Sequence, residues 1–85
     1  MQVKIDQPIV NALKTLHDVP DTVRARIDGI TGENGGYVLK LSDDDATAIA
    51  ELVQWHIKTD PATGRPTPES VAFNELIRRI DEAMF

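Results

Sequence analysis

The chain has 85 residues, a formal net charge of −5 at pH 7, 41% hydrophobic residues and no cysteine. This length predicts one domain with a single small core, and the absence of cysteine excludes a disulfide scaffold, a thiolate zinc site and a cysteine nucleophile. The negative net charge argues against broad, non-specific binding of nucleic acid, and no apolar stretch approaches the length of a membrane span.

The first twenty residues predict a short strand followed by a helix. Apolar residues alternate with polar ones over residues 2–6, which is the pattern of a strand with one buried face. Asp6 and Pro8 are typical of the start of a helix, and an apolar stripe at helical spacing then continues to about residue 17. Pro20 ends this segment.

Residues 22–30 are compatible with either a strand or a helix. Their apolar residues alternate with charged ones, as in a half-buried strand, whereas Pro20 and Gly29 would suit the two ends of a short helix. We favour the strand, because the glycine-rich residues 31–36 follow it and lead into another alternating run. The two runs would then form a hairpin.

The stretch from Tyr37 to Lys58 predicts a strand that passes directly into a helix, and we expect the rest of the fold to be organised around it. Apolar residues alternate as far as Leu41 and then change to helical spacing. Ser42 at the junction is typical of an N-cap, and the three aspartates after it suit the positive end of the helix dipole. The apolar arc of this helix is wide, which predicts contact with both the sheet and another helix.

The last third of the chain predicts a turn and a final helix. Residues 59–64 have turn chemistry, with Gly64 as a left-handed exit. Thr67 then suits the cap of a helix that begins at Pro68 and runs to the end of the chain. We therefore predict one α+β domain over residues 1–85. Its order is strand, helix, hairpin, helix, helix, and its three-stranded antiparallel sheet has the helices packed on one face.

No motif in the sequence predicts catalysis or a metal site. The three adjacent aspartates of residues 43–45 point about 100° apart on a helix, and neither histidine has the spacing of a zinc ligand pair. His56 is more simply a hydrogen-bonded histidine at the edge of the core. Ser42 and Ser70 both fall in helix-cap turns rather than in a nucleophile motif. We predict no catalytic residue, no cofactor and no metal, and keep an enzyme or enzyme subunit as the third interpretation.

The parity of the three predicted strands places four of the nine basic residues on one open face of the sheet: Lys4, Arg24, Arg26 and Lys40. Such residues usually keep an open sheet soluble and discourage edge pairing, and the functional alternative is a docking face for an acidic partner. Nucleic acid is the weaker version, because this face lacks the aromatic side chains on which bases stack. The patch exists only if residues 22–30 form a strand.

Trp55 is the only tryptophan, and it falls at the edge of the apolar arc of its helix with Ala48 and Leu52. A lone tryptophan in a small domain is usually part of the core or of its edge. The alternative is an exposed anchor for a partner, since tryptophan is enriched in binding hot spots.

These features predict a small acidic cytoplasmic protein, of bacterial or phage origin, that docks a protein partner or a second copy of itself. The open face and the two edges of the sheet favour a homodimer. The alternative is a nucleic-acid-related protein, acting as a weak binder through the sheet face or as an acidic decoy through its helices. The first residues do not resemble a signal peptide, because no apolar run follows Lys4, and no membrane contact is expected.

Overall fold

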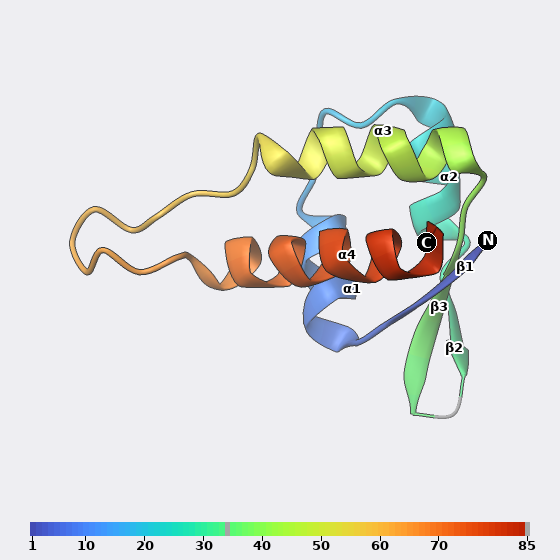
Figure 1. Ribbon diagram of the computed structural model, residues 1–85, viewed down its shortest axis with the longest axis horizontal. Coiled ribbons are helices and arrows are strands. Elements are labelled where there is room, and N and C mark those ends of the chain that lie inside the picture. The colour runs from blue at the N-terminus through green and yellow to red at the C-terminus, as the bar shows by residue number, and fades with distance from the viewer. Residues whose placement is uncertain (34, 85) are drawn as a thin grey trace.

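The computed structural model describes residues 1–33 and 35–84, which form four helices and a three-stranded antiparallel sheet (Figure 1). The α+β class and the sheet predicted from the sequence are confirmed. In chain order the elements are β1 (Gln2–Ile5), α1 (Gln7–Lys14), α2 (Asp21–Asp28), β2 (Thr31–Glu33), β3 (Gly36–Lys40), α3 (Asp43–Gln54) and α4 (Pro68–Met84).

The sheet has the order β1-β3-β2, so β3 is the central strand and both of its neighbours run antiparallel to it. Val3 lies opposite Leu39 and both are buried, as is Ile5 two residues further along β1. This face of the sheet belongs to the same apolar core as the helices. The alternation of apolar and polar residues in β1 therefore gives the strand and its buried face as predicted.

The strand predicted for residues 22–30 is wrong, because most of this segment forms helix α2. Val23 and Ile27 are both buried, whereas Ala25 between them is exposed, so the true period is four residues rather than two. Pro20 occupies the N-cap position and Gly29 the C-cap position, as the helical alternative required. The order along the chain is thus strand, helix, helix, hairpin, helix, helix.

The hairpin is present, but its first strand lies in the segment that was predicted to be its turn. Thr31 pairs with Val38, and Glu33 pairs with Gly36. Only two residues separate this last pair, and the second of them, Gly35, has a φ of 82°. The Asn-Gly dipeptide between the strands is a strong signal for a two-residue hairpin turn, so strands immediately on either side of it were the better prediction.

Helix α3 is central to the core, but its wide apolar face packs mainly on two helices rather than on the predicted sheet and helix. Ala46, Ile49 and Val53 have no exposed surface, and α3 contacts both α2 and α4. Figure 1 shows α3 and α4 lying side by side in opposite directions. Both α1 and α3 are shorter than predicted, since α1 ends at Lys14 and α3 at Gln54.

Ser42 begins α3 with a reciprocal pair of hydrogen bonds. Its Oγ accepts from the Asp45 backbone N–H at 3.1 Å, and its own N–H donates to the Asp45 carboxylate at 3.5 Å. This arrangement satisfies N–H groups that have no acceptor within the helix. The predicted N-cap is confirmed, and it fixes the point at which the chain leaves β3 and enters α3.

Candidate interaction surfaces

The four basic residues predicted to share the sheet face do not do so, because Arg24 and Arg26 lie on α2. Arg24 donates from Nη2 to the backbone oxygen of Leu16 at 2.9 Å, which holds the α1–α2 connection. Arg26 donates from Nε to Asp45 Oδ2 at 2.9 Å and so links α2 to the start of α3. Both arginines make contacts within the domain, and the four-residue docking face is not formed.

Lys4 and Lys40 do share the open face of the sheet. Lys40 lies opposite Gln2 and Lys4 lies opposite Val38, which puts both lysines on the face that Leu39 does not occupy. Arg26 and Lys40 line the same shallow hollow, together with Gln2 and Ser42. The guanidinium of Arg26 is already paired with Asp45, so two lysines are what remains of the predicted patch on the sheet.

Trp55 is the most exposed large hydrophobic side chain among the described residues, with 82% of its surface accessible to solvent. It is the C-cap residue of α3, and its backbone N–H donates to the backbone oxygen of Leu52 at 3.2 Å. The backbone at this point is therefore fixed while the indole lies outside the core. The sequence was compatible with either a buried or an exposed position for Trp55, and the structure shows that it is exposed. Helix α4 packs along α3 without covering it.

The chain after Trp55 projects from the body of the domain as an arm formed by residues 58–67 (Figure 1). The backbone N–H of Asp60 donates to the backbone oxygen of Arg65 at 2.8 Å, and the backbone oxygen of Asp60 accepts from the N–H of Gly64 at 2.8 Å. Gly64 has a φ of 70°. Thr59 and Pro66 form an isolated bridge. The predicted turn and its left-handed glycine are confirmed.

A buried serine closes the base of this arm. Ser70, with no exposed surface, accepts the Lys58 backbone N–H at 2.6 Å and shares a hydrogen bond with the Thr67 hydroxyl at 2.8 Å. Thr67 in turn accepts the Ser70 N–H at 3.2 Å, as expected of an N-cap residue. The base of the arm is thus fixed to α4, and the arm begins three residues after Trp55.

His56 lies at the edge of the core, as predicted. Its ring centroid is 6.3 Å from that of Phe73, and its Nε2 is 3.4 Å from Asp18 Oδ1 in the α1–α2 connection. The two neighbours therefore differ, because His56 packs against the domain and Trp55 lies in solvent.

A groove of about 500 Å³ lies between the start of α1 and the part of α4 from Pro68 to Arg78. A smaller hollow shares Pro8 and Pro68 with it and continues along α1, so we treat the two as one surface and call it the α1–α4 groove. Two small buried side chains, Ala12 and Ala72, line it, one from each of the two helices. Its lining includes Asp6, Pro8, Glu69, Val71, Glu75 and Arg78.

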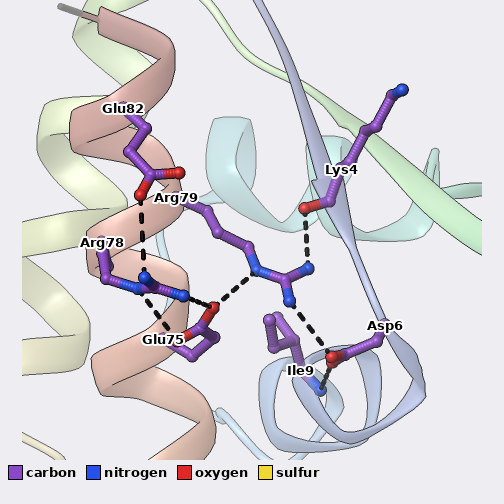
Figure 2. Close-up of polar contacts among 7 residues, drawn as sticks. All are labelled: Lys4, Asp6, Ile9, Glu75, Arg78, Arg79 and Glu82. Atoms are coloured by element: carbon purple, nitrogen blue, oxygen red, sulfur yellow. Dashed lines mark hydrogen bonds and ion pairs between the residues drawn. The ribbon is translucent and has the colours of Figure 1, made fainter.

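Arg79 ties α4 to the junction between β1 and α1, beside one end of the α1–α4 groove (Figure 2). It donates to the Lys4 backbone oxygen at 3.0 Å, to Asp6 Oδ2 at 3.3 Å and to Glu75 Oε1 at 3.1 Å. Arg78, on the other side of Glu75, also donates to that carboxylate and lies 3.8 Å from Glu82. This network holds Asp6 and Glu75 in place, and it occupies one backbone acceptor on the outer edge of β1.

Two carboxylates in such contacts are more acidic than usual. The hydrogen bond from Arg78, and after it that from Arg79, lowers the pKa of Glu75. The pKa of Asp45 is lowered first by the Ser42 hydroxyl and then by Arg26. Both carboxylates therefore bind protons more weakly in the folded than in the unfolded chain, so their contribution to stability is present above the unfolded pKa, about 4, and is lost as the pH falls below it.

We accordingly expect the melting temperature to fall as the pH is lowered from about 6 to about 3, because protons then favour the unfolded chain. Glu75→Gln should make this decline shallower. Glu51→Gln on the exposed surface of α3 is the matched control, since it removes the same charge without removing the contacts to Arg78 and Arg79. Circular dichroism melts at several pH values measure the effect, and an equally steep decline in Glu75→Gln would contradict it.

Within residues 1–33 and 35–84, the histidine, aspartate and glutamate side chains form no cluster of three that could hold a metal ion. Over the same residues, no helix combines the length and the apolar composition needed to cross a bilayer. The chain matches no family model, no curated protein and no solved structure with which it was compared. Its surfaces, rather than a family relationship, therefore carry the functional argument.

Proposed function

We propose that this protein is a small, non-catalytic interaction module that docks another protein through a surface centred on Trp55. The observation that carries the proposal is the 82% exposure of the tryptophan side chain, well above the 54% of Val71, the next most exposed large apolar residue among those described. An exposed indole keeps a large apolar area in water, and covering it with a partner recovers that hydrophobic free energy. Tryptophan is accordingly among the residues most enriched in binding hot spots.

Two neighbouring features favour docking at this position. The C-terminal end of α3 fixes the backbone of Trp55, so little main-chain order is lost when a partner binds. The arm of residues 58–67 begins three residues after Trp55 and is rich in polar residues, including Lys58, Asp60 and Arg65. A central aromatic anchor with a polar surround is the usual arrangement of a protein interface.

The nucleic-acid alternative is less well supported than this proposal. Its sheet-face version depended on four cations sharing one surface, and Arg24 and Arg26 are on α2 with contacts of their own. The docking face for an acidic partner depended on the same four residues, so we do not retain it beside the Trp55 surface.

We expect Trp55→Ala to weaken binding of the partner by about 30-fold or more, since a hot-spot side chain contributes roughly 2 kcal/mol or more. Immobilised wild-type chain and variant would be compared in affinity capture from cells that express the protein, followed by titration of the captured partner. Gln54→Ala is the matched control, because it truncates the neighbouring exposed residue at the end of the same helix.

Trp55 also supplies a direct readout, because it is the only tryptophan in the chain. Its emission should shift to shorter wavelength when a partner covers the indole, and a shift on concentrating the protein alone would identify a second copy as the partner. A partner that binds wild type and Trp55→Ala equally well would contradict the proposal.

A further inference from the structure

The α1–α4 groove combines an apolar lining with an excess of negative charge. Val71, which is 54% exposed, lines it together with Pro8, so an apolar surface remains open to solvent. Three carboxylates, those of Asp6, Glu69 and Glu75, line the groove together with the guanidinium of Arg78. A second guanidinium, that of Arg79, lies beside it and binds two of these carboxylates, so the local excess is one negative charge. This is a different surface from that of Trp55, whose side chain lines neither hollow.

The positive charge in the groove is already committed to partners within the domain. Arg78 donates to Glu75 and lies 3.8 Å from Glu82, which is itself negative. Arg79 holds Asp6 and Glu75 in fixed positions by hydrogen bonds of 3.3 and 3.1 Å. Asp6 and Glu75 are therefore ordered before any ligand arrives, which reduces the entropy that binding must cost.

We propose that the α1–α4 groove binds a basic amphipathic helix of a protein partner. A groove between two helices suits the docking mode in which the apolar face of a third helix lies along it, with anchors at i, i+3, i+4 and i+7. Lysine or arginine residues flanking that face would meet the acidic lining, which favours fast and selective association. A second copy of this chain fits less well, because it carries a net charge of −5.

The first test uses two synthetic helical peptides with the same leucine face, one with lysine and one with glutamate on the flanks. We expect the lysine peptide to bind the full chain at least about tenfold more tightly at low salt, and the difference to shrink at about 0.5 M salt, where charges are screened within a few ångströms. Isothermal titration calorimetry measures both affinities. Nuclear magnetic resonance shift mapping should place the changes on α1 and α4.

The second test uses variants with matched controls. Val71→Gln should weaken the lysine peptide about tenfold, because it removes an apolar contact, whereas Trp55→Gln should leave its affinity unchanged. Glu69→Gln should weaken it about two- to fivefold, as expected for an exposed charge pair, whereas Glu51→Gln on α3 should not. Circular dichroism confirms that each variant is folded.

These outcomes also separate the groove from the Trp55 surface. Equal binding of the two peptides, no binding of either, or affinities unaffected by Val71→Gln and Glu69→Gln would overturn the groove proposal and leave the Trp55 proposal standing. Self-association in sedimentation equilibrium that is lost in Val71→Gln would also overturn it, since the occupant would then be a second copy of the chain.

Discussion

Replacing Phe73 with alanine is expected to lower the free energy of unfolding by about 3–5 kcal/mol. Phe73 is the largest of the buried side chains described, with 2% of its surface exposed. It lies on α4, which packs against α3, and belongs to the apolar core. The loss combines the transfer free energy of the ring with the cost of the cavity it leaves. A domain of this size has a total stability of only about 4–13 kcal/mol, so the variant would lose much of it.

Denaturant unfolding followed by far-ultraviolet circular dichroism measures this effect. Val71→Ala is the matched control, because it lies two residues away on α4 with its side chain 54% exposed, and we expect a change within about 0.5 kcal/mol. Tryptophan emission is the poorer probe, since Trp55 is exposed in the folded protein as well. Equal midpoints for Phe73→Ala and Val71→Ala would mean that α4 does not complete the core as described.

The elements that sequence pattern predicted correctly are those whose signals are local. Ser42 caps α3 through a bond to Asp45 three residues away, and Gly64 adopts the positive φ that the turn requires. In both cases the conformation is determined by residues that are close together in the chain. The buried stripe of α3, including Ile49, followed from spacing along a single helix.

Residues 22–30 were mispredicted because their apolar residues fit both the two-residue period of a strand and the four-residue spacing of a helix. Val23, Ala25 and Ile27 alternate as a strand would, yet the i,i+4 pair Val23 and Ile27 is also the buried edge of a helix. The helix is favoured by tertiary packing, because α2 contacts α3 and β3. The hairpin that follows is also closed by a turn of only two residues. A two-residue turn left no need for residues 22–30 to pair with β3.

The candidate surfaces were harder to predict than the elements, because they arise between segments far apart in the chain. Arg79 is 75 residues from Lys4, whose carbonyl it binds, and the α1–α4 groove joins the two ends of the sequence. Trp55 was identified as a candidate, but its exposure depends on where α4 packs against α3. Helical periodicity placed it at the edge of the apolar arc and could not decide which side of that edge it occupies.

Ala25→Pro tests the helical assignment of residues 21–28 and is expected to cost about 3 kcal/mol or more. In the interior of α2 a proline removes the hydrogen bond from residue 25 to the carbonyl four residues before it, and its ring clashes with that carbonyl. Ala25 is exposed, so the substitution removes no core contact and its cost reports the backbone alone. Denaturant midpoints, with nuclear magnetic resonance shifts for α2, measure the effect.

Asp21→Pro is the matched control, because it introduces the same residue at the first position of the same helix. There a backbone N–H has no acceptor within the helix, and a proline is tolerated. Pro20 before it has φ −57° and ψ 150°, the extended conformation that a residue preceding proline adopts. We expect a cost below about 1 kcal/mol, mainly from losing an acidic group near the positive end of the helix dipole. If residues 22–30 formed an edge strand, proline at position 25 could face solvent at small cost and the contrast between the two variants would disappear.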